Sequence, residues 1–329
     1  MTENDDQKDW FFEELVKHVM IRQTGVLTAG KTLKFLGRKL VHRGDHVLVK
    51  CLDGYITDVL ALYNMEHCKG GNTTGTSLVK CPLNGDEALD WDGHRLYRTA
   101  VGKLIWLCTV RPDIDFAVKE LSRAVQLPTE EDLAKMKHLL RYLKKTEHLS
   151  LQLKPTHTLS NDPTAPIEIH SYGDTDWAGC RLTRKSTTGC IVQVLGCTVM
   201  HCSRTQATVA LSSCEAECYG TGTALSEGLF IKSLILETGL GRPQLSTYTD
   251  SSSGKQFSLK SGLSPKLKHV QIRFLWIQDC FNANDSKLCK IHTSLNLGDL
   301  GTKYLGTEQL NKLIALCGMV DTVNVNMIF

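Results

Sequence analysis

The order of strand-like and helical segments after residue 166 limits the fold of this chain more than any other feature. Several short stretches alternate apolar and polar residues, which is the period of a half-buried strand, and they come before and after a long helical segment. Strands first and a helical crossover next predict an α/β fold with a mixed sheet flanked by helices. The strands are expected at 167–174, 190–196, 197–203, 245–250 and 287–292, and the helices at 212–238, 268–281 and 307–318.

A polar segment at residues 155–166, PTHTLSNDPTAP, separates that pattern from the first part of the chain. Its proline, threonine and asparagine content disfavours both helix and strand, so we expect a linker there. The linker divides the chain into domains at 1–154 and 167–329. The first domain is predicted to be mainly helical, apart from a hairpin at 43–45.

Composition excludes several classes of protein. With 42% hydrophobic and 22% charged residues, the chain has the make-up of a globular protein with a packed core. No apolar run is long enough to span a bilayer and the N-terminus is acidic, so we expect neither membrane insertion nor secretion. The 13 cysteines form no tight framework and are expected to be reduced thiols in the cytoplasm or nucleus. A net charge of +3 is too mild to indicate a nucleic-acid partner.

Four acids of the second region lie at the ends of predicted elements. Asp174 ends the first strand, Glu217 lies in the first turns of the long helix, Asp250 ends a later strand and Asp299 opens the last helical stretch. Ligands gather at the carboxyl ends of strands in α/β sheets, so these acids are candidates for one site. Converging carboxylates repel unless cations lie among them, and Mg²⁺ is the natural ion for such oxygen ligands. The acids also fit an ordinary set of caps and surface charges, and spacing alone does not decide between the two interpretations.

Two of these positions have a neighbouring acid that competes for the same role. Ser212 and Glu215 fit the capping box S-x-x-E, in which the glutamate reaches back to the amide of the capping serine. Glu217, about 200° further round the helix, has no cap to serve, and we therefore expect it to face the other acids. Asp174 and Asp176 share one face if the strand continues, and we prefer Asp174 because it is closer to the strand.

The sequence around these acids resembles a known family. The second region contains, in order, SYGDTDWAGCRLTRKSTTGC, VALSSCEAECYGTGTALSEG, YTDSSS, KHVQIRFLW and NLGDLGTKYL. These stretches closely resemble, in the same order, the ribonuclease H region of copia-type LTR retrotransposon Pol polyproteins. Upstream, YITDVLALYNMEHCK and YRTAVGKLIWLCTVRPDIDFAVKELSR are similar to the thumb and connection of that family's reverse transcriptase. The resemblance implies a ribonuclease H-like domain preceded by a thumb and connection remnant.

The resemblance also implies an activity and a set of site residues. The family's acids carry over onto Asp174, Glu217, Asp250 and Asp299 as catalytic residues and metal ligands. The implied enzyme is a ribonuclease H, an endonuclease that hydrolyses the RNA strand of an RNA–DNA hybrid with two Mg²⁺ ions, or with Mn²⁺ in their place. Basic and hydroxyl residues near the acids are expected to hold the nucleic-acid backbone. These substrate-binding residues are Arg184, Lys185, Ser186, Ser251, which replaces the family's asparagine, and Lys268.

Departures from the family leave a second interpretation open. The Y-x-D-D hairpin of the polymerase palm is absent from the sequence, so reverse transcription by this chain alone is not expected. A catalytically silent or domesticated nucleic-acid-binding remnant of a retroelement is the alternative to an active nuclease. Besides the hybrid, the expected partners are the palm and fingers of a polymerase, or a second copy bound through residues 1–154, with a retroelement particle as a further location.

Overall fold

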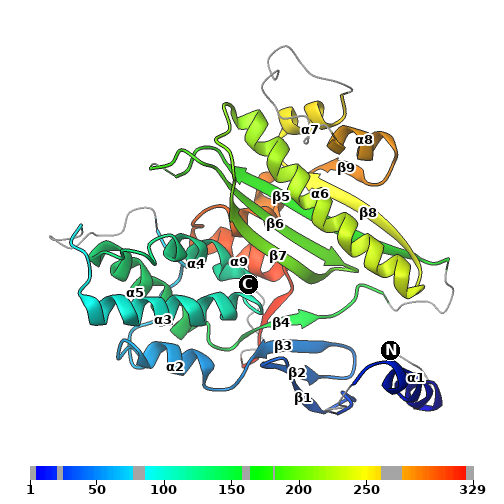
Figure 1. The fold of residues 1–329 in the computed structure, drawn as a ribbon, viewed down its shortest axis with the longest axis horizontal. Helices are drawn as coiled ribbons and strands as arrows, with labels where there is room; N and C mark the ends of the chain where they lie inside the picture. Colours follow the sequence, from blue (N-terminus) through cyan, green and yellow to red (C-terminus); the bar gives the residue numbers. More distant parts are fainter. Residues whose placement is uncertain are drawn as a thin grey trace.

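Two five-stranded sheets and the helices around them make up this molecule (Figure 1). The computed structural model describes residues 5–20, 25–76, 86–157, 164–180, 182–260 and 276–323. Within these ranges, no helix is both long enough and apolar enough to cross a lipid bilayer.

The first region of the chain contains helices and short strands. Its elements are α1 (Asp5–His18), β1 (Thr32–Phe35), β2 (Arg38–His42), β3 (Val47–Cys51), α2 (Tyr55–Ala61), α3 (Trp91–Cys108), the 3₁₀ turn η1 (Pro112–Ile114), α4 (Asp115–Ser122), α5 (Glu130–Lys145) and β4 (Leu149–Leu153). The hairpin expected at 43–45 is present between β2 and β3. Thr129 caps α5, and Asp132 completes a capping box with it.

The second region carries the elements that the sequence pattern predicted, together with several short turns. They are β5 (Pro166–Asp176), β6 (Thr187–Val194), β7 (Cys197–Thr205), α6 (Ser213–Thr238), β8 (Arg242–Thr249), α7 (Ser252–Ser258), α8 (Trp276–Asn282), β9 (Lys287–Lys290), the 3₁₀ turns η4 (Thr293–Leu295) and η5 (Leu297–Gly301), α9 (Thr307–Leu316) and β10 (Met319–Asp321). Ser212 caps α6, and Gly239 ends it with a left-handed φ of 65°. Of the helix expected at 268–281, the part before residue 276 lies outside the described residues.

The second sheet has the strand order β7-β6-β5-β8-β9. Its central strand, β5, is antiparallel to β6 and parallel to β8, and β8 is parallel to β9. The long helix α6 makes the crossover from the edge strand β7 to β8. The predicted α/β fold with a mixed sheet flanked by helices is therefore confirmed.

The first sheet has the order β1-β2-β3-β4-β10, and its adjacent strands are antiparallel. Its last strand comes from the far end of the chain, since Met319 of β10 lies opposite Leu151 of β4. The division into domains at 1–154 and 167–329 stays a prediction, but the C-terminal strand clearly packs with the first region.

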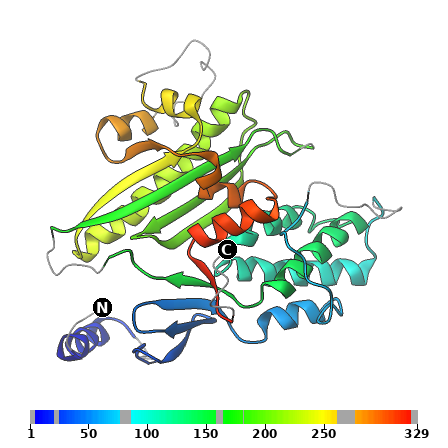
Figure 2. The ribbon, with the colours of Figure 1, turned by 180° about the vertical axis from the view of Figure 1, so that it is seen from behind.

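Both faces of the second sheet are covered. The helix α6 crosses one face, whereas η5 and α9 lie on the other, as the opposite views in Figures 1 and 2 show. Side chains alternate accordingly along β6: Cys190 and Val192 belong to the core under α6, and Ile191 belongs to the core shared with α3, α4 and α5. The first region therefore packs against the second through a continuous apolar core.

Arg111 and Asp113, which follow α3, form a fully buried ion pair that also bonds to residues at the end of α5. Arg111 donates from Nε and Nη2 to the two carboxylate oxygens of Asp113, at 2.8 and 2.7 Å. The same guanidinium donates to the carbonyl and hydroxyl of Thr146 at 2.9 and 2.8 Å, and the Tyr142 hydroxyl donates to Asp113 at 2.7 Å. Every charged atom of the pair thus has a partner, which is the condition under which a buried pair is tolerated.

Removing one member of this pair is expected to destabilise the fold strongly. The Arg111→Met chain should lose about 3–5 kcal/mol of unfolding free energy, because the Asp113 carboxylate stays buried without its counter-ion. Adding Asp113→Leu should recover part of that loss, since the orphaned charge is then removed as well. Urea denaturation followed by circular dichroism measures both changes.

The exposed pair Arg95–Asp92 provides a matched control, because its side chains are 70% and 75% exposed. Arg95→Gln should change the unfolding free energy by less than about 1 kcal/mol. An Arg111→Met chain as stable as the Arg95→Gln chain would show that the buried pair does not hold the helices together.

Candidate active site

Parallel pairing of β5 and β8 brings Asp174 and Asp250 together. The last pair in register is Tyr172 with Tyr248, whose rings stack with their centroids 5.0 Å apart. Asp174 and Asp250 each follow two residues later, so their carboxyl groups approach each other at this edge of the sheet. The strand β5 continues through Asp176, two residues beyond the end predicted from sequence.

The turn η5 places Asp299 against the same strand end. The buried Asn296 side chain donates to the carbonyl of Gly173 at 3.0 Å and accepts the amide of Gly298 at 3.2 Å, which fastens η5 to β5. Gly298 lies so close to β5 that a Cβ atom on it would stand 2.6 Å from the amide nitrogen of Asp174. A larger residue there would push Asp299 away from Asp174.

The three aspartates form a compact cluster. One carboxylate oxygen from each of Asp174, Asp250 and Asp299 lies within 4.8 Å of the other two. The Nζ atom of Lys303 lies 2.8 Å from Oδ1 of Asp299 and 3.6 Å from Oδ2 of Asp174. The Thr302 hydroxyl donates to Oδ2 of Asp174 as well. An ammonium group and a hydroxyl of the chain itself therefore contact these carboxylates.

Glu217 faces this cluster from the first turns of α6. Burial and, to a smaller extent, the negative charges of Asp174 and Asp250 together raise the pKa of Glu217 to about 8. Charges act in this way only on a carboxyl group that lies near them. Because Glu217 does not belong to the group within 4.8 Å, the site consists of three close aspartates with the glutamate beside them.

The neighbouring Glu215 has the capping role expected of it. The Glu215 side chain is buried, and the Glu215 amide donates to the Ser212 hydroxyl at 3.2 Å. Its carboxylate accepts the amide of Leu211 at 2.7 Å and the hydroxyl of Tyr219. The capping box predicted that the carboxylate would reach the Ser212 amide, whereas it reaches the amide one residue earlier.

Polar contacts fix the start of α6 on the strand that carries Asp174. The Thr175 hydroxyl and the Gln206 side-chain amide both donate to the carbonyl of Ala216 at 3.1 Å. One turn further along the helix, a Cβ atom on Gly220 would stand 2.3 Å from the Thr175 hydroxyl oxygen. Helix and strand can approach this closely because Gly220 has no side chain, and Glu217 is thereby brought toward the aspartates.

Burial and like charges raise the pKa values of two carboxyl groups in and beside the cluster, Asp299 and Glu217. Burial raises the pKa of Asp299 to about 8, and the charge of Asp174 acts in the same direction against the opposing effect of Lys303. Burial lowers the pKa of Lys303, but the charges of Asp174 and Asp299 outweigh that effect and raise the pKa overall. Lys303 is therefore a permanent cation that offsets only part of the negative charge.

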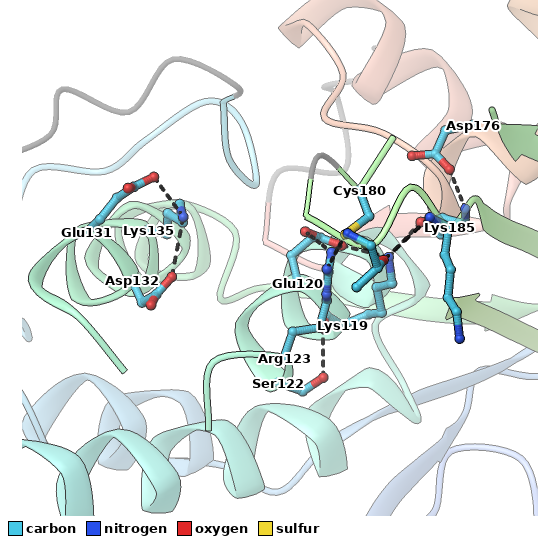
Figure 3. Close-up of polar contacts among 12 residues, drawn as sticks. Lys119, Glu120, Ser122, Arg123, Glu131, Asp132, Lys135, Asp176, Cys180 and Lys185 are labelled. Carbon is cyan, nitrogen blue, oxygen red and sulfur yellow. Dashed lines mark hydrogen bonds and ion pairs between the residues drawn. The ribbon is translucent and has the colours of Figure 1, made fainter. Parts of the chain in front are cut away.

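Asp176 is not one of the three close aspartates. Its carboxylate accepts the amide of Thr187 at the start of β6 (Figure 3). Burial raises the pKa of Asp176 to about 6 although that hydrogen bond lowers it. Of the two aspartates that the sequence left in competition, Asp174 is the one that lies with the other acids.

The loop between β5 and β6 carries three of the predicted substrate-binding residues. Arg184 is exposed, with a φ of 57°, and Lys185 is half-buried. Ser186 is fully buried, and its hydroxyl accepts the Ala178 amide at 3.0 Å. Direct contact with a ligand is therefore open to Arg184 and Lys185, whereas Ser186 supports the shape of the loop.

The helix α4 of the first region holds this loop in place. Arg123 donates to Sγ of Cys180 at 2.5 Å (Figure 3), and the Thr183 hydroxyl donates to the same sulfur at 2.9 Å. Burial tends to raise the pKa of Cys180, but these donors lower it to about 7. Lys119 donates to the Thr187 hydroxyl at 2.6 Å. The first region thus supports a loop that lies next to the acid cluster.

The other two predicted substrate-binding residues are Ser251 and Lys268, and only Ser251 lies within the described part of the chain. Ser251 directly follows Asp250 and caps α7, where its hydroxyl accepts the Gly254 amide at 3.0 Å. Lys290 donates to the carbonyl of Asp250 at 2.8 Å and steadies the same turn. Lys268 lies outside the described residues.

The donor set of the cluster suits a hard divalent cation. Each aspartate offers a carboxylate oxygen, the ligand type that Mg²⁺ and Mn²⁺ prefer. Two of the three carboxylates are buried, and like charges so close together repel one another. Since Lys303 supplies one positive charge only, a divalent ion fits both the chemistry and the charge of these residues.

Thr302, Lys303 and Asn296 contact the cluster or the turn that carries Asp299, and none of them was predicted as a site residue. Thr302 and Lys303 follow Asp299 by three and four residues, a spacing that returns side chains to one side of a helical turn. That spacing was the available signal for the ion pair between Lys303 and Asp299. The role of Asn296 depends on contact with a distant strand, which no local pattern indicates.

The chain is similar in sequence to transposon polyproteins, and no family model matches it. It is 31% identical over 298 residues to the retrovirus-related Pol polyprotein from transposon TNT 1-94 of Nicotiana tabacum, covering 88% of this chain and 22% of that protein. The corresponding polyprotein from transposon RE1 of Arabidopsis thaliana is 32% identical over 268 residues, with 80% and 18% covered. That from RE2 of the same plant is 30% identical over 290 residues, with 87% and 19% covered.

Among solved structures, the chain is similar to the N-terminal RNase H domain of Rv2228c from Mycobacterium tuberculosis, determined as a fusion with maltose-binding protein. The match covers 45% of this chain and 97% of that one, with 10% identity and a TM-score of 0.31. Sequence similarity is the stronger finding, and it extends over both regions, although the chain spans only about a fifth of the length of the polyproteins. Over 80–88% of its length, the chain is homologous to retrovirus-related Pol polyproteins from transposons.

Proposed function

We propose that this chain is a metal-dependent ribonuclease H that hydrolyses the RNA strand of RNA–DNA hybrids as part of a retrotransposon polyprotein. The observation that carries the proposal is the convergence of Asp174, Asp250 and Asp299, whose carboxylate oxygens lie within 4.8 Å of one another. These aspartates come from two adjacent strand ends and a separate turn, and Glu217 lies beside them on a helix. Caps and solvated surface charges have no reason to converge in this way.

The chain's own residues would divide the work at the scissile phosphate. Asp174, Asp250, Asp299 and Glu217 would hold two Mg²⁺ ions, or Mn²⁺ in their place. When bound, such ions act as Lewis acids that lower the pKa of an attacking water and stabilise the leaving oxygen. Lys303 lies 43% exposed at the rim of the cluster, where its ammonium group can contact a phosphate oxygen.

Backbone contacts would come from the loop between β5 and β6 and from the turn after β8. Arg184 and Lys185 are placed to meet phosphates, and Ser251 lies next to Asp250. RNA is distinguished from DNA by its 2′-hydroxyl groups across a wide, shallow minor groove, so we expect little sequence preference. Residues 1–154 would serve as the thumb and connection remnant and support this loop through α4.

The Asp174→Asn chain is expected to bind hybrid and to cut it at least about 100-fold more slowly. Loss of one ligand charge removes several kcal/mol of transition-state stabilisation, and each 1.36 kcal/mol is a factor of ten in rate. The measurement is a divalent-metal-dependent cleavage assay on labelled RNA–DNA hybrid, with binding followed by fluorescence anisotropy.

Asp176→Asn is the matched control for that experiment, because this residue accepts the Thr187 amide and an asparagine oxygen can do the same. It should leave cleavage within a few-fold of the original chain. Equal cleavage by the Asp174→Asn and original chains would refute the proposal. Hybrid binding without cleavage by the original chain would favour a silent nucleic-acid-binding remnant.

Glu217→Gln should chiefly reduce cleavage, whereas Glu215→Gln should chiefly reduce thermal stability. Glu217→Gln is expected to reduce cleavage by about 100-fold or more while leaving thermal stability unchanged or higher, because glutamine cannot become a buried negative charge beside the other acids at any pH. Glu215→Gln should chiefly lower the melting temperature, because it weakens the cap of α6. Cleavage rates and thermal melts of the two chains check this, and the reverse pattern would exchange the roles of the two glutamates.

Without metal, the acid cluster should destabilise the fold as the pH rises. The ordinary pKa values of Glu217 and Asp299 are 4.5 and 3.8, and both are raised to about 8 in the folded chain. Between these values the folded chain binds more protons than the unfolded chain, so the contribution of these groups to unfolding free energy falls as the pH rises from about 4 to about 8.

Mg²⁺ should therefore raise the melting temperature more at about pH 8 than at about pH 5.5, because metal binding requires deprotonated carboxylates. Differential scanning fluorimetry with and without Mg²⁺ measures the difference. The double variant Glu217→Gln/Asp299→Asn should lose both the pH dependence and the metal effect. A Mg²⁺ shift of equal size at both pH values would contradict the assignment.

A further inference from the structure

Two cysteines lie directly opposite each other on adjacent antiparallel strands. Cys190 of β6 is the register partner of Cys202 of β7. Both side chains point to the face covered by α6, where Cys190 is 1% exposed and Cys202 is partly buried. Opposed residues of an antiparallel pair have Cβ atoms about 4.5–5.5 Å apart, and a disulfide needs about 3.5–4.5 Å. A small approach of the two strands is therefore enough to join the sulfurs.

The surroundings of the pair favour an attacking thiolate at Cys202. The pKa of Cys202 is lowered, first by a hydrogen bond from the Cys190 thiol and also by the nearby charge of Arg204. The same hydrogen bond and burial raise the pKa of Cys190. Arg204 in turn pairs with Glu227 of α6 at 2.8 Å, which fixes the guanidinium near the sulfur. A lowered pKa and partial exposure are two features of reactive cysteines.

A path from solvent reaches one of the two residues. Cys202 is only half-buried, and Arg204, two residues further along the same strand, is exposed. Since β7 is the edge strand of its sheet, Cys202 can be approached from outside the fold. Cys190, in contrast, lies on the next strand inward and is shielded by it.

We propose that Cys190 and Cys202 form a reversible cross-strand disulfide, at a modification site whose reactant is a low-molecular-weight disulfide. The Cys202 thiolate attacks one sulfur of the reactant, a mixed disulfide forms, and the other half leaves as a thiolate. Cys190 then loses its proton and attacks Sγ of Cys202, and the second half leaves as a thiolate. Two protein thiols are oxidised, one external disulfide is reduced, and two protons are released.

The strands that carry this cysteine pair also contact η5, the turn that carries Asp299. Gly189, next to Cys190, lies so close to η5 that a Cβ atom on it would stand 2.2 Å from the carbonyl oxygen of Gly298. The carbonyl of Cys202 would likewise stand 2.9 Å from a Cβ atom on Gly301. Strand movement at the cysteine pair is therefore passed directly to η5. The proposal itself does not depend on the nuclease assignment.

Treating the full chain with oxidised glutathione tests the proposal. Of the 13 cysteines, two should lose their free thiols together, and dithiothreitol should restore both. Chymotryptic cleavage after Leu195 separates Cys190 from Cys202, so mass spectrometry of the unreduced digest should find the two peptides joined. This measurement uses the original chain and does not require a variant to fold.

Variants distinguish the two steps of the reaction. Cys190→Ala should stop at a mixed disulfide with one glutathione on Cys202, and Cys202→Ala should lose both the adduct and the internal bond. Cys197→Ala is the matched control, because Cys197 lies on the same strand opposite Val194 and should leave the disulfide intact. The proposal is overturned if the oxidised original chain, still folded by circular dichroism, retains both Cys190 and Cys202 as free thiols or joins either to another cysteine.

Discussion

Repulsion between buried carboxylates is the constraint on which the arrangement of this molecule depends. Two like charges about 5 Å apart repel by about 3 kcal/mol at an effective dielectric constant near 20. Three aspartates lie within that range, and Glu217 lies beside them. The chain offsets this repulsion through the ammonium group of Lys303, the Thr302 hydroxyl and the protons retained by Glu217 and Asp299. None of these is as effective as a divalent ion, so the arrangement is one that metal binding would relieve.

The surrounding fold holds the acids in place against their repulsion. Asn296 ties η5 to β5, Gly298 permits the close approach, and Thr175 ties α6 to the same strand. Each contact joins segments far apart in the sequence at a point where there is no room for an extra side chain. Core packing on both faces of the sheet makes these approaches rigid. Preorganisation of this kind is what a site needs to hold charged ligands at fixed positions.

Local rules were sufficient to choose between neighbouring acids. Ser212 caps the helix as the sequence predicted, and the Glu215 carboxylate is occupied at the helix start by the Leu211 amide, which leaves Glu217 for the cluster. Closeness to the strand favoured Asp174 over Asp176, and the hydrogen bond from Thr187 explains where Asp176 goes instead. Strand alternation and the caps likewise predicted the principal elements of the second sheet, because those signals are local.

Features that depend on distant contacts could not be predicted in this way. Pairing of β4 with β10 joins Leu151 to Met319, and no periodicity in either segment indicates the partner. The raised pKa of Asp299 follows from burial and from the charge of Asp174, which are properties of the assembled site. Ser186 is buried because the loop folds back so that its hydroxyl accepts the Ala178 amide, and the sequence pattern does not indicate that contact.

The shared core explains why the first region accompanies the acid cluster. Leu297 and Leu300 flank Asp299 in η5, and both are buried in the same core as Leu104 of α3 and Leu139 of α5. The side of η5 that faces away from the sheet is therefore covered by helices of the first region. Lys119 of α4 and Arg123, which follows that helix, hold the neighbouring loop. Without those helices, a segment bearing one of the three close aspartates would lose its outer support. Residues 1–154 thus have a structural purpose in the acid site.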